Sequence, residues 1–163
     1  MRKRNISVEK IGGTSMSQFK YVLSNIILNK KGCETLYNRI YVVSAYNNVT
    51  NMLLENKKNG KPGIYSEFVN TNSYNKKLDS LLRYLISINK SLESIGLDLK
   101  KANDFIIDRI DQTRNNLQNI SELITSGYVD RSNIYLSARE ILASIGEAHS
   151  AFNSANIVSN NGL

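Results

Sequence analysis

Two strand-like segments flank a helical segment within the first 45 residues, and this order restricts the folds open to the chain. Residues 6–11 alternate apolar and polar side chains, which is the period of a β-strand, and two glycines end the pattern. Ser15 or Ser17 can cap the helix that follows. Its apolar stripe consists of Phe19, Val22, Leu23, Ile26 and Ile27. Residues 40–43 are a continuous apolar run, typical of a buried parallel strand, so the segment predicts one βαβ unit.

Three long helical stripes occupy most of the remaining chain. They cover residues 78–92, 99–124 and 136–152, and Asp130 or Ser132 can cap the third. A shorter helix is expected near residues 52–54 and a loop at residues 57–63. A pair of parallel strands is normally part of a larger sheet covered on both faces. We therefore expect an α/β fold, helix-rich after the first βαβ unit, that forms the front part of a larger domain.

The composition excludes several functional classes. A single cysteine, Cys33, rules out an intrachain disulfide, and with one histidine, His149, there is no His/Cys metal cluster and little scope for a Ser–His hydrolase. No apolar run approaches the roughly 20 residues that span a bilayer, and the first residues lack a signal-peptide core, so we expect a cytoplasmic protein. The 21 Lys and Arg against 14 Asp and Glu give a net charge of +7, which suits an anionic partner such as nucleotide, nucleic acid or membrane.

The junction between the first strand and its helix is the best candidate for a binding site. Ligands of open α/β sheets bind beyond the carboxyl ends of the strands. Here Gly12 and Gly13 would let backbone N–H groups approach an anion, Thr14 and Ser15 would add hydroxyls, and Lys10 would add a full charge. The segment matches neither GxxxxGK[ST] nor GxGxxG, so a plain tight turn is the alternative.

The end of the second strand should lie at the same edge of the sheet. Ser44 and Thr50 would bring two hydroxyls there, although each can also serve simply as a helix cap. In the third long helix, Glu140 is interpreted from the pattern alone as a solvated residue. His149 is expected at the surface or in the core rather than in catalysis. The tyrosines are scattered, so no stacking platform for single-stranded nucleic acid is indicated.

Three segments together resemble the motifs of the aspartokinases. Residues 8–15, Val-Glu-Lys-Ile-Gly-Gly-Thr-Ser, resemble the opening motif KFGGTS, and residues 42–51, Val-Val-Ser-Ala-Tyr-Asn-Asn-Val-Thr-Asn, resemble VVSAxGGVTN. Residues 137–143, Ser-Ala-Arg-Glu-Ile-Leu-Ala, lie where the family carries a GE[LR]xS-type motif. With residues 145–153, Ile-Gly-Glu-Ala-His-Ser-Ala-Phe-Asn, the sequence looks most like the branch associated with ectoine biosynthesis.

The resemblance implies an amino-acid kinase fold, which is an αβα sandwich. Residues 1–163 would be the N-terminal portion of the catalytic domain, without the nucleotide-binding half and the regulatory ACT domains. The implied reaction converts ATP and L-aspartate to ADP and 4-phospho-L-aspartate, with ATP used as its Mg²⁺ complex. The implied partners are these two small molecules, not nucleic acid or membrane, and assembly into a homo-oligomer is left open.

The resemblance also assigns residues to the phosphates. Lys10 would be a catalytic residue that contacts the transferring phosphoryl group, and Gly12, Gly13, Thr14 and Ser15 would cradle the nucleotide phosphates. This agrees with the chemistry, because phosphoryl transfer depends mainly on positioning and charge neutralisation. No metal-binding residue is expected from this chain.

Other residues are assigned to aspartate. Ser44 and Thr50 would bind the substrate, and Glu140 would be a second catalytic residue that orients the substrate amine and the lysine. Asn47 and Asn48 replace the two glycines of the family motif; asparagine tolerates a left-handed backbone, although its side chains would crowd the substrate loop.

Two other functions stay open from the sequence. Because the nucleotide half would be absent, we expect little or no kinase activity from this chain alone. It would then be either an incomplete kinase or a non-catalytic interaction or regulatory module derived from an aspartokinase. Nucleic-acid binding rests only on the net charge of +7.

Overall fold

The two predicted strands pair in parallel as β1 (Ser7–Ile11) and β2 (Arg39–Val43) in a computed structural model that describes residues 6–29, 38–56, 59–127 and 129–163. In their register Ser7 pairs with Arg39 and Ile11 pairs with Val43. Three short helical pieces connect them: α1 (Gly13–Met16), α2 (Phe19–Val22) and the π-helical turn η1 (Leu23–Ile27). The predicted βαβ unit is therefore confirmed, with its helix broken into pieces.

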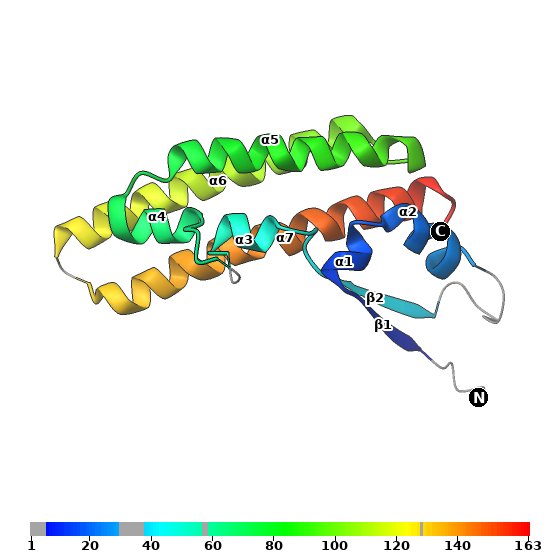
Figure 1. Ribbon diagram of the computed structural model, residues 1–163, viewed down its shortest axis with the longest axis horizontal. Helices are drawn as coiled ribbons and strands as arrows, with labels where there is room; N and C mark the ends of the chain where they lie inside the picture. Colours follow the sequence, from blue (N-terminus) through cyan, green and yellow to red (C-terminus); the bar gives the residue numbers. More distant parts are fainter. Residues whose placement is uncertain (1–5, 30–37, 57–58, 128) are drawn as a thin grey trace.

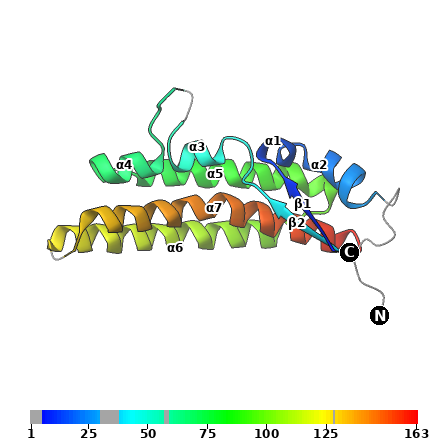
Figure 2. The ribbon, with the colours of Figure 1, turned by 90° about the horizontal axis from the view of Figure 1, so that it is seen from below.

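The three long stripes form α5 (Asn75–Leu92), α6 (Leu99–Ser126) and α7 (Arg131–Asn160), as predicted. Successive helices run back and forth along one another, so that α6 packs on both α5 and α7 (Figures 1 and 2). A short 3-10 helix, η2 (Glu93–Ile95), ends α5 at Gly96. Of the two candidate caps for α7, Asp130 takes the position, since its side chain accepts a hydrogen bond from the Ser132 backbone N–H.

Two shorter helices line the side of α7. The predicted short helix is α3 (Val49–Leu53), which starts slightly earlier than expected. The sequence patterns did not predict α4 (Ile64–Thr71), although Ile64 and Phe68 have helical spacing and both are buried. An eight-residue helix is marginal alone and is stabilised here by packing on α7. Cys33 and the first two residues of the predicted loop, 57 and 58, lie outside the described residues.

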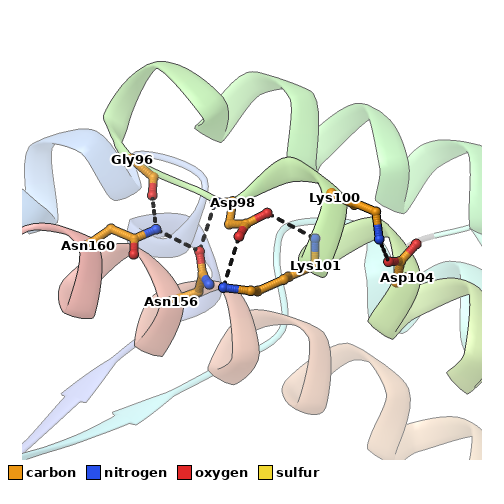
Figure 3. Close-up of polar contacts among 7 residues, drawn as sticks. All are labelled: Gly96, Asp98, Lys100, Lys101, Asp104, Asn156 and Asn160. Carbon is orange, nitrogen blue, oxygen red and sulfur yellow. Dashed lines mark hydrogen bonds and ion pairs between the residues drawn. The ribbon is translucent and has the colours of Figure 1, made fainter.

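The turn between α5 and α6 is tied to the end of α7 by polar side chains (Figure 3). Asp98 caps α6 by accepting a hydrogen bond from the Lys101 N–H at 3.1 Å, and its own N–H donates to Asn156 Oδ1 at 2.8 Å. Asn160 donates from Nδ2 to the Gly96 carbonyl at 2.8 Å. These contacts fix the C-terminal end of α7, which is the part of the helix that faces the sheet.

The prediction that the second strand is buried on both faces is wrong. Ile11, Tyr41 and Val43 on one face of the sheet lie against the C-terminal half of α7, but Ile40 and Val42 on the other face are 51% and 48% exposed. Among the described residues, helices pack against one face of the sheet only. The structure is mixed α/β and mostly helical, and the second helical layer of a sandwich is not seen in the part of the chain described.

A glycine in the middle of α7 allows the segment after β2 to lie directly on this helix. A Cβ added at Gly146 would lie 2.7 Å from the Ala45 Cβ and 3.1 Å from a Val49 methyl carbon. The Ala45 Cβ can move only with its backbone, whereas the Val49 methyl would have to give by a few tenths of an ångström. The missing side chain is therefore what permits the close contact between α7 and α3.

We predict that Gly146→Ala lowers the free energy of unfolding by about 1–3 kcal/mol through overpacking. Alanine is the better helix former by about 1 kcal/mol, so helix propensity alone would give the opposite sign. Urea unfolding measures the change, and Ser144→Ala on the exposed face of the same helix serves as a control that stays within about 0.5 kcal/mol. Unchanged or increased stability of Gly146→Ala would contradict the packing described.

Candidate functional site

The carboxyl ends of β1 and β2 meet, as the parallel pairing requires. The Ser44 backbone N–H donates to the Ile11 carbonyl at 3.0 Å, which holds the two chain segments together just beyond the strands. A Cβ added at Gly13 would lie 3.0 Å from the Ala45 carbonyl oxygen, so a glycine allows this close approach. The expectation that the glycine pair and Ser44 share one edge of the sheet is confirmed.

A polar pocket of about 410 Å³ opens at this edge. Three segments line it: the turn after β1, the segment from β2 into α3, and the middle of α7. Its lining consists of Gly13, Thr14, Ser44, Ala45, Tyr46, Asn47, Asn48, Thr50, Asn51 and Glu147. Four residues proposed from the sequence therefore come together here, namely Gly13, Thr14, Ser44 and Thr50.

Other residues proposed from the sequence do not line this pocket. Gly12 and Ser15 flank the lining residues of the first turn. Lys10 is exposed and shares a face of the sheet with Val8, because side chains alternate along a strand. Glu140 also lies outside: its side chain is 75% exposed and its carboxylate is 3.7 Å from the Arg139 guanidinium. On α7 it precedes Glu147 by two turns, about 10 Å along the axis.

Glu147 is not among the site residues proposed from the sequence, although its neighbours carry a motif that points to it. The family pattern GE[LR]xS requires a glycine before the glutamate and a serine three residues after it. Gly146, Glu147 and Ser150 have this spacing, whereas Glu140 follows Arg139. The structure explains the glycine as well, because Gly146 lies against Ala45 and so brings the next residue, Glu147, to the pocket.

The segment that lines the pocket is anchored to the helices through Tyr46. Its ring is 4% exposed and makes an edge-on contact with the His149 imidazole, with ring centroids 5.5 Å apart. Asn153 donates from Nδ2 to the Tyr46 hydroxyl at 3.5 Å and to Asn89 Oδ1 at 2.8 Å. These side chains from α5 and α7 thus surround Tyr46 with a buried polar cluster.

Neighbouring residues of the same segment are held too. The Tyr84 hydroxyl donates to the Asn47 carbonyl at 3.1 Å, and the Asn47 N–H donates to Ser17 Oγ at 3.3 Å. Asn48 adopts the left-handed conformation, with φ of 65°, so the turn keeps the backbone that the family motif provides with glycine. The side chains of Asn47 and Asn48 belong to the pocket lining.

The shorter of two contacts indicates the tautomer of His149. Its Nε2 lies 2.6 Å from Asn89 Oδ1, an amide oxygen that can only accept, and 3.2 Å from Asn153 Nδ2, which can only donate. The shorter contact is a hydrogen bond when Nε2 carries the proton. Asn89 is itself oriented by donating from Nδ2 to Asn103 Oδ1 at 2.9 Å. Nδ1 of His149 is buried without a partner among the described residues. Burial lowers the pKa of His149 to about 4 and raises that of Tyr46 to about 12, so both are neutral at pH 7.

A comparison with known proteins supports the resemblance drawn from the motifs. The chain is 44% identical over 151 residues to the aspartate kinase Ask_Ect of Stutzerimonas stutzeri, a match that covers 91% of this chain and 32% of that relative. The similarity to the aspartokinases is confirmed. The chain spans about a third of the length of the curated relative it matches. No family model matches the chain, and no solved structure matches it.

The pocket at the strand ends has a distinct composition. It offers hydroxyls, amides and one carboxylate, and none of the described residues that line it is a lysine or an arginine. Within the described ranges, no group of three or more His, Cys, Asp and Glu side chains could hold a metal ion. No described helix combines the length and apolar character needed to cross a membrane.

The buried His149 predicts a specific pH dependence of stability. The folded state disfavours the charged imidazole. The stability contributed by the neutral imidazole is therefore complete above the pKa of about 6.5 in the unfolded chain, and it is lost as the pH falls toward the folded-state pKa of about 4. Between pH 7.5 and 5 this residue accounts for a loss of about 2 kcal/mol. Urea unfolding of the wild type and His149→Gln measures it, since the variant lacks the titrating group. Equal pH dependence in both proteins would contradict a buried neutral histidine.

Proposed function

We propose that the pocket at the strand ends binds the aspartate substrate of an aspartokinase reaction. The observation that carries this proposal is the convergence of Ser44, Thr50 and Glu147 beside the turn at Gly13 and Thr14. The hydroxyls of Ser44 and Thr50 suit the carboxylates of L-aspartate, and the carboxylate of Glu147 suits its ammonium group. Glu147 thereby takes the role that the motif comparison first gave to Glu140. The name of the relative, an aspartate kinase, supports the same substrate.

The proposed chemistry requires little from the protein beyond positioning. An oxygen of the aspartate side-chain carboxylate attacks the γ-phosphorus of ATP, and the new O–P bond forms as the bond from phosphorus to the oxygen of ADP breaks. The carboxylate is already deprotonated at neutral pH, so no general base is needed. The products are ADP and 4-phospho-L-aspartate. Catalysis then consists of alignment and neutralisation of the phosphate charge.

ATP would enter as its Mg²⁺ complex, so the metal belongs to the substrate. In the proposal, Gly12, Gly13, Thr14 and Ser15 contribute backbone N–H groups and hydroxyls to the phosphates, and Lys10 contributes the positive charge. Lys10 lies outside the pocket, and no described Lys or Arg lines it. For this reason we expect little or no turnover from the chain alone. The single cysteine favours the cytoplasm as the location.

A non-catalytic interaction module is the second candidate, and the uncovered sheet face favours it. Val8, Ile40 and Val42 expose apolar side chains on that face. At the same time the buried apolar residues of the βαβ unit and of the helices form a continuous core. A module of this kind binds a protein partner without binding aspartate, so the ligand experiment below separates the two functions.

Aspartate binding to the chain alone tests the first candidate. We predict that Glu147→Gln raises the Kd for L-aspartate about 10- to 100-fold, because a charged hydrogen bond is lost, and that Thr50→Val raises it about two- to tenfold. Isothermal titration calorimetry gives both values. Glu140→Gln is the matched control on the same helix and should leave the Kd unchanged. Absence of binding, or an equal effect of the two glutamate variants, would contradict the proposed site.

A further inference from the structure

The chain contains two Asn-Gly dipeptides, Asn59-Gly60 and Asn161-Gly162. This dipeptide is prone to a spontaneous reaction in which the glycine nitrogen attacks the asparagine side chain, because glycine has no side chain to obstruct the attack. All the residues of both dipeptides are exposed, so access to solvent does not distinguish the two sites. Their hydrogen bonds, however, differ in kind.

The first dipeptide lies between α3 and α4. We call the described residues of this segment, 54–56 and 59–63, the arm. Figure 2 shows that the arm projects from the helical body. Its base is closed, because the Gly63 N–H donates to the Leu54 carbonyl at 3.0 Å. The dipeptide therefore belongs to an exposed turn that is held at its base.

The side chain of Asn59 is held in a position that favours the attack. Its Oδ1 accepts a hydrogen bond from the Lys61 backbone N–H at 3.1 Å, which is the contact of an Asx turn. Such a turn folds the side chain over the intervening peptide and brings Cγ close to the Gly60 nitrogen. The same N–H polarises the side-chain carbonyl, as a donor does in an oxyanion hole. Among the described residues, nothing holds Asn59 Nδ2, the nitrogen that has to leave.

One hydrogen bond opposes the reaction. The Gly60 N–H donates to the Asn56 carbonyl at 2.8 Å, and the nitrogen must give up this proton before it attacks. The bond lies in an exposed turn, and such turns open at low free-energy cost. We therefore expect the fold to slow the reaction at Asn59 only slightly relative to the unfolded chain.

Asn161 is held in the opposite way. It follows the last residue of α7, and its Nδ2 donates to the Ile95 carbonyl at 3.1 Å and to the Ile157 carbonyl at 2.8 Å. These bonds retain the nitrogen that would have to leave and fix the side chain to two helix ends. The Gly162 N–H also donates to the Ser159 carbonyl at 3.1 Å. Reaction at Asn161 thus requires the loss of several contacts together.

We propose that Asn59 is a site of spontaneous deamidation in the folded protein and that Asn161 is protected. The Gly60 nitrogen forms a bond to Asn59 Cγ, the bond from Cγ to Nδ2 breaks, and ammonia leaves with the proton of the Gly60 nitrogen. Water then opens the resulting cyclic imide to aspartate or isoaspartate. The reaction needs only solvent water and is independent of the proposed function.

The product differs from asparagine in charge and, as isoaspartate, in backbone length. The new carboxylate lies near Lys61 in the sequence and lowers the net charge of +7 by one unit. Isoaspartate adds a carbon atom to the main chain, so the hydrogen bond from the Asn56 N–H to the Lys61 carbonyl, at 3.0 Å, loses its register. Because the base is closed at Gly63, we expect the change to stay within the arm.

Peptide mapping by mass spectrometry tests this proposal on the full chain incubated in warm, mildly alkaline buffer. Deamidation changes the peptide mass by the difference between OH and NH₂, and a protein isoaspartate methyltransferase labels the isoaspartate. In the folded chain we expect Asn59 to react at least about tenfold faster than Asn161, because only Asn59 is positioned for attack. In urea the two sites should react at similar rates, since the fold no longer distinguishes them.

Asn59→Gln is the matched variant, because its longer side chain would have to form a larger and less favourable ring. It should lose the isoaspartate signal of the arm and keep the slow reaction at Asn161. Its thermal unfolding should stay close to that of the unchanged chain, since residue 59 is exposed. Equal rates at the two asparagines of the folded chain would overturn the proposal. So would an Asn59 that stays unmodified in the folded chain, or an isoaspartate content that Asn59→Gln leaves unchanged.

Discussion

The close contact between Gly146 and the segment after β2 determines the arrangement of the candidate site. Because Gly146 has no side chain, α7 can lie directly on Ala45 and Val49. The next residue, Glu147, then lines the pocket, and His149 reaches the ring of Tyr46. One short stretch of α7 thus supplies the close packing, the acidic group and the buried polar contact that together place the strand ends.

This arrangement gives the chain two surfaces of different chemistry. The pocket at the strand ends contains hydroxyls, amides and a carboxylate, which suit a small zwitterion such as an amino acid. Lys10 lies on the exposed face of the sheet beside the apolar side chains of Val8 and Val42. Under the proposed function, the pocket would position the acceptor of phosphoryl transfer, and Lys10 would contribute to neutralising the phosphate.

Features set by local patterns could be predicted from the sequence. The alternation of residues 6–11 and the helical stripes gave the βαβ unit and α5, α6 and α7, and parallel pairing implied that Ser44 would meet the turn at Gly13. The exposure of Ile40 and Val42 could not be predicted, because an apolar run does not reveal which layers cover a strand. Glu140 and Glu147 lie two turns apart on one side of α7, so helical periodicity does not distinguish them; the spacing of Gly146, Glu147 and Ser150 and the contact at Gly146 do.

The ends of β1 and β2 and the middle of α7 form one pocket, which we propose binds L-aspartate. Backbone amide shifts of the ¹⁵N-labelled chain during titration with L-aspartate test it residue by residue. We predict that the largest shifts occur at Gly13, Thr14, Ser44, Thr50 and Glu147, with little change in the polar groove of residues 121–125 at the far end of α6. No shifts, or shifts centred away from the strand ends, would contradict it.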